Sequence, residues 1–229
     1  MAKRYWSNGI ALACALALAS CGNGNSATGG DDGDPAGAEV PVMGPTLRVL
    51  AFGDSLFAGY GVGLENSYPA KLQNALRARG TNAIITNAGV SGDTTAAGRQ
   101  RLAFTLDGQA VKPDLVILGL GGNDILRSLP PEETRANLDA MMQEITSRDI
   151  DVMLMGMRSP TNLGGVFGGK FDSIYPDLAR KYDAELVPFF LEAIYTDRSL
   201  FQNDRIHPTV EGIELIVEDT VDEVEDALD

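Results

Sequence analysis

Residues 47–53 read Leu47-Arg48-Val49-Leu50-Ala51-Phe52-Gly53, a short apolar run that stops at a glycine. Its length and its flanks predict a buried strand. Further runs of this kind follow along the chain and predict strands at residues 83–88, 115–120, 152–157 and 185–188. The chain therefore offers short buried strands for one sheet.

Segments with helical features separate these runs. Helices are predicted over residues 67–79, 94–106, 130–148 and 171–182, and a last one follows the N-cap residue Thr209. Strands that alternate with helices form a parallel sheet covered on both faces. The sequence therefore predicts an α/β domain of three layers, α/β/α, around a five-stranded parallel sheet.

Glycine-containing segments follow three of the strands. They cover residues 53–55, 89–92 and 121–124, and all three emerge at the same edge of a parallel sheet. Ligands of such sheets bind beyond the carboxyl ends of the strands. We therefore expect the functional site at this edge.

The chain has one histidine, His207, in the segment Asp204-Arg205-Ile206-His207-Pro208. Because imidazole titrates near neutrality, a histidine base here can only be His207. The Asp-x-x-His spacing brings the Asp204 carboxylate to Nδ1 and leaves Nε2 free to face a serine. Ser55, at a predicted strand-to-helix turn, is the candidate nucleophile. Taken singly, Gly-Asp-Ser also fits a capped turn, and His207 and Asp204 also fit structural roles.

Gly92 and Asn123 are candidate donors to an oxyanion. Gly92 has no side chain to keep its N–H from a ligand, and the Asn123 side chain carries an amide donor. The alternatives are a simple turn before a helix capped by Asp93, and a satisfied loop asparagine. Asp124 is expected to brace its own loop rather than to react.

Four blocks of this sequence resemble the GDSL, or SGNH, hydrolase family and occur in the family's order. They are Phe52-Gly53-Asp54-Ser55-Leu56, Gly92, Gly121-Gly122-Asn123-Asp124 and Asp204-Arg205-Ile206-His207-Pro208. The segments 88–94, 120–124 and 187–190 resemble the bacterial subgroup called arylesterase, thioesterase I or lysophospholipase L1. The resemblance covers nearly the whole span from Leu47 to the final helix.

This resemblance implies a flavodoxin-like SGNH hydrolase fold and a role for each matching residue. Ser55 would be the nucleophile, His207 the base and Asp204 its orienting acid. The oxyanion hole would consist of the Ser55 N–H, the Gly92 N–H and the Asn123 Nδ2. The reaction needs no metal or organic cofactor, and we expect none.

The segment 158–170 follows the fourth predicted strand and contains two glycine pairs. It predicts a mobile flap over the acyl site, with Leu163, Val166 and Phe167 facing the substrate. A passive surface loop is the alternative.

The first 45 residues differ from the rest of the chain. Residues 1–20 combine a basic start with an apolar run too short to span a bilayer, which predicts a secretory signal. The end of this segment resembles a bacterial lipobox with Cys21 as the lipidated residue, and an ordinary signal is the alternative. Residues 21–45 predict a flexible tether, and residues 46–229 form the hydrolase domain. We expect an exported protein that is lipid-anchored to the cell envelope, with the outer membrane or periplasm favoured.

The net charge is −14, and it becomes −16 once Lys3 and Arg4 leave with the signal. This balance disfavours nucleic acid and anionic lipid headgroups as partners, and we expect the N-terminal lipid anchor to be the only membrane attachment. It also predicts activity in molar salt, where screening relieves self-repulsion.

The leading hypothesis is a serine esterase that acts on a small-molecule ester through a Ser-His-Asp triad and an acyl-enzyme. Short-chain acyl or aryl esters are the first choice, and lysophospholipids or thioesters are possible substrates. A carbohydrate O-deacetylase and a non-catalytic binding module on the same fold are the alternatives.

Overall fold

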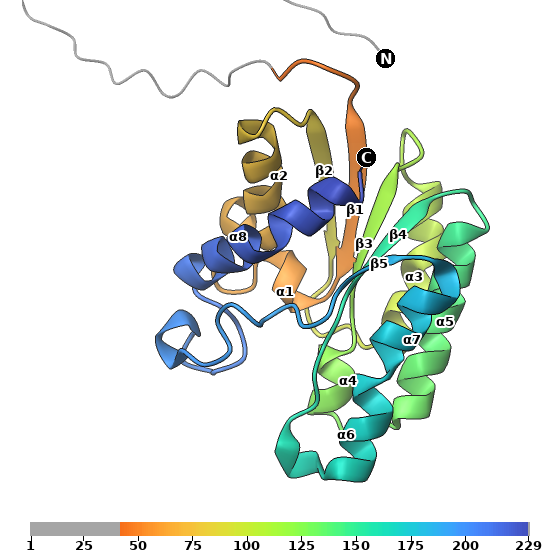
Figure 1. Cartoon of the computed structure of the whole chain (residues 1–229), viewed down its shortest axis with the longest axis vertical. Helices are drawn as coiled ribbons and strands as arrows, with labels where there is room; N and C mark the ends of the chain where they lie inside the picture. Colours follow the sequence, from red (N-terminus) through yellow and green to blue (C-terminus); the bar gives the residue numbers. More distant parts are fainter. Residues whose placement is uncertain (1–41, 229) are drawn as a thin grey trace, which may run out of the picture. The chain divides into compact units, whose positions relative to one another are not determined.

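The structure is a computed structural model that describes residues 42–228 (Figure 1). The predicted signal at residues 1–20, the predicted lipidation site Cys21 and the predicted tether as far as residue 41 lie outside the described residues. Within residues 42–228, no helix combines the length and the apolar character that crossing a membrane requires.

The central element is a five-stranded sheet with the order β2-β1-β3-β4-β5, in which every pairing is parallel. Its strands are β1 (Leu47–Gly53), β2 (Ala83–Gly89), β3 (Leu115–Gly119), β4 (Asp151–Met155) and β5 (Glu185–Val187). Each predicted strand is present, with ends that shift by one or two residues. The α/β fold with a five-stranded parallel sheet is confirmed.

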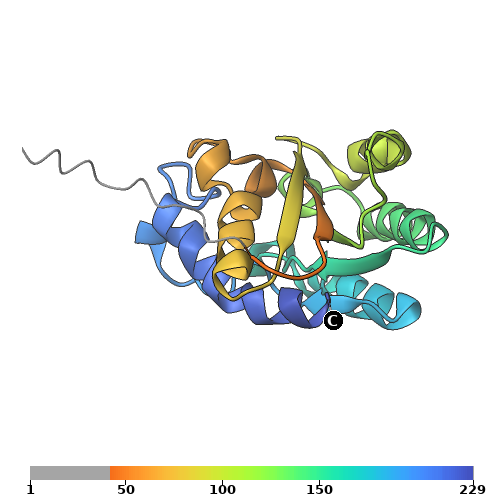
Figure 2. The same cartoon turned by 90° about the horizontal axis from the view of Figure 1, so that it is seen from above.

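Helices cover both faces of the sheet (Figures 1 and 2). One layer contains α1 (Ser55–Ala58), α2 (Tyr68–Ala78) and α8 (Val210–Asp226), and the other contains α3 (Thr95–Asp107), α5 (Pro131–Thr146), α6 (Gly165–Asp172) and α7 (Ile174–Tyr182). The strand side chains alternate between two cores, because successive residues of a strand point to opposite faces. On β1, Val49 and Ala51 pack in the first core, whereas Leu50 and Phe52 pack in the second.

The helix starts follow the capping residues of the sequence. Ser67, Thr94 and Thr209 each accept a hydrogen bond from a backbone N–H in the first turn of α2, α3 and α8. Thr94, and not Asp93, therefore caps α3. Asp93 instead accepts a 2.6 Å hydrogen bond from Arg101 Nε.

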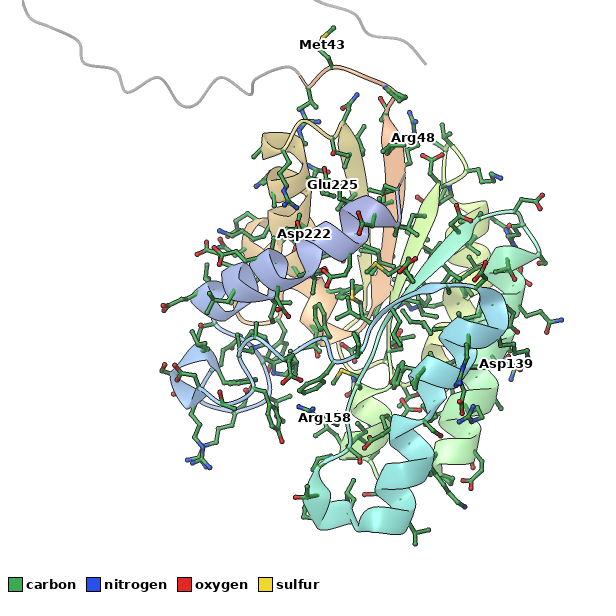
Figure 3. All side chains as sticks on the ribbon, viewed as in Figure 1. Met43, Arg48, Asp139, Arg158, Asp222 and Glu225 are labelled. Carbon is green, nitrogen blue, oxygen red and sulfur yellow. The ribbon has the colours of Figure 1, made fainter. Side chains whose placement is uncertain are left out.

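The acidic final helix is held to α2 by contacts with basic and hydroxyl groups. Arg79 forms ion pairs with Asp222 and with Glu225, the second at 3.3 Å, and Thr81 Oγ1 donates to Glu225 at 2.7 Å. Figure 3 labels both acidic residues on α8 beside α2. Some of the acidic side chains of α8 thus stabilise the packing of α8 against α2.

The segment 158–170 is not the loop that the sequence predicts. It contains a 3-10 turn (Thr161–Leu163) and most of α6. Glycine lowers helix propensity, but the rings of Phe167 and Phe171 stack with centroids 6.0 Å apart, and the latter is fully buried. The apolar contact therefore outweighs the poor local propensity.

The strand ends at the predicted functional edge carry a row of glycines. Gly53 pairs with Gly89 on one side and with Gly119 on the other. A Cβ on Gly89 would lie 2.5 Å from the Ala58 amide nitrogen, and one on Gly119 would lie 2.7 Å from the Phe57 ring. The short helix α1 therefore lies directly against the backbone of the strand ends.

Three further short elements lie in the connections at or near this edge. They are a 3-10 turn (Leu64–Asn66), α4 (Gly122–Leu126) and a 3-10 turn (Arg198–Leu200). The last belongs to the long connection from β5 to α8, where Phe201 and Pro208 form an antiparallel bridge. This bridge folds residues 202–207 into a loop that reaches back to α1.

Candidate active site

Ser55, His207 and Asp204 form one chain of hydrogen bonds, although the serine and the histidine are 152 residues apart in sequence. Ser55 Oγ lies 2.9 Å from His207 Nε2, and His207 Nδ1 lies 2.7 Å from Asp204 Oδ2. Because Asp204 accepts from Nδ1–H, Nε2 carries the lone pair and accepts from the serine hydroxyl. The structure thus brings the three predicted residues together.

A tight turn fixes the relation between Asp204 and His207. Asp204 Oδ1 accepts from the Ile206 N–H at 2.9 Å and from the His207 N–H at 3.0 Å, while Oδ2 holds the imidazole. Arg205, between them, has a left-handed backbone with φ +60°. One carboxylate oxygen therefore closes the turn and the other orients the ring.

These donors also set the charge of Asp204. Burial by itself would raise its pKa, but the hydrogen bonds from the His207 side chain, the His207 amide and the Ile206 amide, together with the charge of His207, lower the pKa to about 2. Asp204 is therefore ionised at neutral pH, and its charge can stabilise an imidazolium beside it.

Two residues outside the predicted set support the histidine. The Tyr60 ring lies against the imidazole with centroids 4.2 Å apart. Gln202 supports the histidine through the backbone. Its Nε2 donates to the carbonyls of Tyr60 and Pro208, both at 2.9 Å, and its N–H donates to the His207 carbonyl at 2.7 Å. Gln202 therefore ties the loop that carries His207 to the loop that carries Tyr60.

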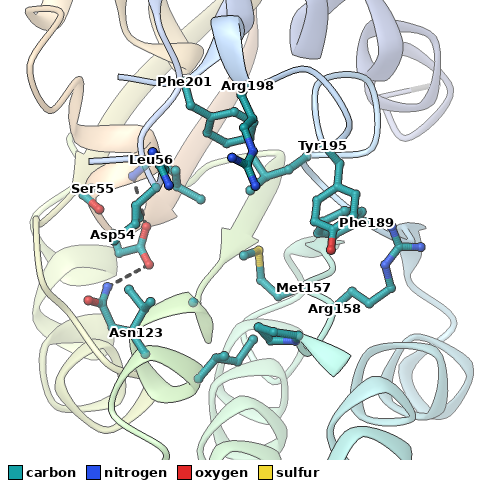
Figure 4. A pocket seen from close by; sticks show the side chains of 17 residues that line it. Asp54, Ser55, Leu56, Asn123, Met157, Arg158, Phe189, Tyr195, Arg198 and Phe201 are labelled. Carbon is teal, nitrogen blue, oxygen red and sulfur yellow. Dashed lines mark hydrogen bonds between the residues drawn. The ribbon is translucent and has the colours of Figure 1, made fainter. Parts of the chain in front are cut away.

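Asn123 lines the same pocket as Ser55, and its side chain is held by Asp54. Asn123 Nδ2 donates to Asp54 Oδ2 at 3.0 Å, and Asp54 Oδ1 accepts from the Leu56 N–H at 3.1 Å (Figure 4). Asp54 is 3% exposed. Burial raises its pKa to about 6 even though both hydrogen bonds lower it. The second hydrogen of Nδ2 remains available to a ligand.

Gly92 lies in the turn after β2 and does not line the pocket that contains Ser55. Its φ is +86°, and its carbonyl accepts from Arg127 Nη2 at 2.8 Å. The backbone of this turn is therefore fixed from the α4 side. Whether its N–H serves an oxyanion remains a prediction.

Asp124 is a structural residue of the site. Its carboxylate accepts from the Thr95 amide at 2.8 Å and from the hydroxyls of Thr95 and Thr134 at 2.5 and 3.1 Å. These contacts join α4 to the N-terminal ends of α3 and α5. Asp124 thus braces the segment that carries Asn123.

A pocket of about 500 Å³ opens beside Ser55 (Figure 4). Apart from Asp54, Ser55 and Asn123, its lining consists of apolar and aromatic side chains, three arginines and Gly122. They are Leu56, Ile125, Leu126, Met157, Arg158, Pro160, Phe189, Leu191, Tyr195, Arg198, Phe201, Arg205 and Ile206. Such a lining suits a small, largely apolar ligand with a polar group.

The predicted substrate contacts from the segment 158–170 require a correction. Leu163 and Phe167 pack against the second core, and Val166 is 79% exposed. None of the three lines the pocket; Arg158 and Pro160 do so instead. The reason is the local structure: the 3-10 turn places Leu163 against the core, and the helix α6 turns Phe167 toward the core and Val166 toward solvent.

Within residues 42–228, no group of three or more His, Cys, Asp or Glu side chains is arranged to hold a metal ion.

Comparison with known proteins identifies hydrolases as relatives of this chain. Residues 51–215 match the model of the GDSL-like Lipase/Acylhydrolase family. An arylesterase of Vibrio mimicus is 39% identical over 171 residues, which are 75% of this chain and 84% of the relative. Thioesterase 1/protease 1/lysophospholipase L1 of Escherichia coli K12 is 36% identical over 160 residues, 70% of this chain and 74% of the relative.

A solved structure gives the same result. The crystal structure of AlinE4, described as an SGNH-hydrolase family esterase, is 57% identical and superposes with a TM-score of 0.69 over 82% of this chain and 99% of that one. The chain belongs to the GDSL-like lipase/acylhydrolase, or SGNH hydrolase, family.

Proposed function

We propose that the chain is a serine esterase that hydrolyses carboxylic esters through an acyl-enzyme formed on Ser55. The observation that carries this proposal is the continuous hydrogen-bond chain from Ser55 Oγ through His207 to Asp204. A serine hydroxyl is a weak nucleophile until a base accepts its proton, and the imidazole lies within reach of that proton.

In the first step Ser55 Oγ attacks the ester carbonyl carbon while its proton passes to His207 Nε2. Asp204 stabilises the imidazolium that forms, since it is ionised and accepts from Nδ1–H. The carbonyl oxygen becomes an oxyanion. Removing one donor from such a site typically costs about 10²–10³-fold in rate.

The donors to this oxyanion are proposed to be Asn123 Nδ2, the Ser55 N–H and the Gly92 N–H. The Ser55 amide is the first of helix α1 and has no intrahelical partner. Asn123 is oriented by its bond to Asp54 and keeps one free hydrogen. The contribution of Gly92 depends on the turn that Arg127 holds.

Collapse of the tetrahedral intermediate breaks the bond to the leaving alcohol, which takes its proton from His207. Water then attacks the acyl carbon while His207 accepts its proton. Collapse of this second intermediate breaks the bond to Ser55 Oγ, which takes the proton back from His207 as the carboxylic acid leaves. The pocket is largely apolar and small. We therefore propose short-chain acyl or aryl esters as substrates, in agreement with the arylesterase name of one relative.

A test of this function uses fluorophosphonate labelling and hydrolysis of p-nitrophenyl butyrate. The wild type should react covalently at Ser55 and hydrolyse the ester, and Ser55→Ala should do neither. Ser147→Ala, which removes an exposed hydroxyl that contacts only the Glu144 carbonyl, is the matched control. An unlabelled but folded wild type would contradict the proposal and favour a non-catalytic module.

We also propose that the chain is exported and anchored through a lipid on Cys21, on the sequence evidence alone. Expression of the full chain and of Cys21→Ser, followed by separation of membrane and soluble fractions, tests it. The wild type should sediment with the envelope and the variant should be released. If the wild type and Cys21→Ser distributed equally between the fractions, the proposed lipid anchor would be contradicted.

A further inference from the structure

Two arginines of the pocket differ from every other basic residue in residues 42–228. The side chains of Arg198 and Arg205 have no hydrogen bond or ion pair with the protein. Each other lysine or arginine in this part of the chain has at least one such contact. With 32 acidic against 18 basic residues in the chain, free cations are unexpected.

Both of these side chains line the pocket that contains Ser55. Arg198 begins the 3-10 turn Arg198–Leu200, and Arg205 lies in the turn between Asp204 and His207. Figure 4 shows Arg198 beside Phe201, with its guanidinium over the open part of the pocket. Arg205 is held by a hydrogen bond from its N–H to the Gln202 carbonyl at 2.9 Å. Two separate segments therefore bring a free guanidinium to the same pocket.

The third arginine of the pocket, Arg158, differs from these two because its guanidinium is paired within the protein. Arg158 pairs with Glu192 at 3.1 Å, and its guanidinium lies 4.3 Å from the centroid of the Phe189 ring and 5.2 Å from that of Tyr195. Its charge is thus compensated by the protein. The charges of Arg198 and Arg205 are left for a ligand.

We propose that Arg198 and Arg205 recognise a carboxylate or phosphate group on the ester substrate, away from the bond that Ser55 attacks. This inference rests on the proposed esterase function. A guanidinium presents a planar fork of donors that matches both anions, and the apolar lining beside it accepts the rest of the molecule. The substrate class is therefore a small amphiphilic ester with one negative group.

The experiment compares matched esters in pairs. Wild type, Arg198→Gln, Arg205→Asn and the double variant are assayed on p-nitrophenyl butyrate and on mono-p-nitrophenyl glutarate, which carries a carboxylate on the acyl side. A second pair, phenyl butyrate and 4-butyryloxyphenyl phosphate, places a phosphate on the alcohol side. Asparagine is chosen at position 205 because it tolerates the left-handed backbone. Arg180→Gln, an exposed arginine paired with Asp177, is the control.

The quantity compared is the ratio of kcat/KM for the charged ester to that for its neutral partner. We expect this ratio to fall about 5-fold in each single variant and about 20-fold in the double variant, values reduced for solvent exposure. Arg180→Gln should keep the wild-type ratio. Because the arginines are exposed, 1 M NaCl should lower the wild-type ratio and leave that of the double variant unchanged.

The pair that responds identifies the anion and the side of the ester on which it lies. An unchanged ratio for both pairs in a double variant that still labels at Ser55 would overturn the anion site alone. A wild type that hydrolyses none of the four esters and does not label would overturn the proposed esterase function itself.

Discussion

Two aspartates, Asp54 and Asp204, lie next to Ser55 and His207, and their surroundings shift their pKa values in opposite directions. Asp54 precedes the nucleophile at the end of β1 and is 3% exposed. Asp204 lies in the turn before His207, and its side chain is 36% exposed. The pKa of the first is raised to about 6, and that of the second is lowered to about 2.

The difference comes from the balance between burial and donors. At Asp54 burial outweighs the Leu56 amide, the Asn123 side chain and the charge of His207, which stabilise its ionised form. At Asp204 burial is the largest single influence, but three N–H groups together with the charge of the imidazole outweigh it. Proximity to a catalytic side chain therefore does not decide the role of a carboxylate. One aspartate supports the imidazolium, and the other positions an amide.

The largest effect should come from breaking the chain that ends in Asp204. Ser55→Ala and His207→Ala should each lower kcat for p-nitrophenyl butyrate by about 10⁶-fold, and the double variant should lose little more, because the two act as a unit. Steady-state kinetics on protein of native circular dichroism checks this. A His207→Ala variant that kept most of its activity would remove the proposed base.

Asp204→Asn should lower kcat by about 10⁴-fold, less than the loss of His207, because the amide no longer selects the Nδ1–H tautomer or stabilises the imidazolium. The pH profile separates this from a structural role. A rise of the residual rate with pH, as hydroxide replaces the base, is expected, whereas a uniformly scaled profile would argue for simple misplacement.

Asn123→Ala should lower kcat by about 10²–10³-fold with a smaller change in KM, since the lost donor acts on the oxyanion rather than on the bound ester. The companion variant Asp54→Asn keeps the Asn123 amide but replaces the carboxylate that accepts its hydrogen bond. It should cost less in kcat than Asn123→Ala; the reverse order would mean that Asp54 has a role beyond positioning.

The raised pKa of Asp54 should make the free energy of unfolding depend on pH. A pKa that is higher in the folded state favours folding below the unfolded value of 3.8, and this contribution is lost as the pH rises through about 6. Between pH 4 and 7 the wild type should therefore lose about 2.4 kcal/mol of unfolding free energy relative to Asp54→Asn. Urea unfolding at several pH values measures this, with the exposed Asp183→Asn as control. Parallel curves for wild type and Asp54→Asn would contradict it.

Much of the fold follows from local patterns in the sequence. Short apolar runs predict all the strands, three of them stopped by glycine, and Thr94 and Thr209 stand at helix starts. Parallel topology then places the ends of β1, β2 and β3 at one edge. The Asp-x-x-His spacing is likewise local, so the turn around Asp204 was open to prediction.

Other features depend on contacts that no local pattern reveals. The helix α6 forms against its glycines because Phe167 finds Phe171 and the core. Tyr60 and Gln202 support His207 from loops that meet it only in the folded chain. The free state of Arg198 likewise depends on where every acidic side chain lies. These are properties of the tertiary structure, and a single sequence does not contain them in readable form.

The glycine row at Gly53, Gly89 and Gly119 has a consequence for protein engineering. Replacing glycine by alanine is a common way to raise thermal stability, because it lowers the entropy of the unfolded chain. Here a methyl group would meet Phe57, the Ala58 amide or a neighbouring carbonyl within 3 Å. Any such gain would be offset by lifting the helix that begins with Ser55. Thermostable variants of this enzyme will therefore have to be sought away from the three central strand ends.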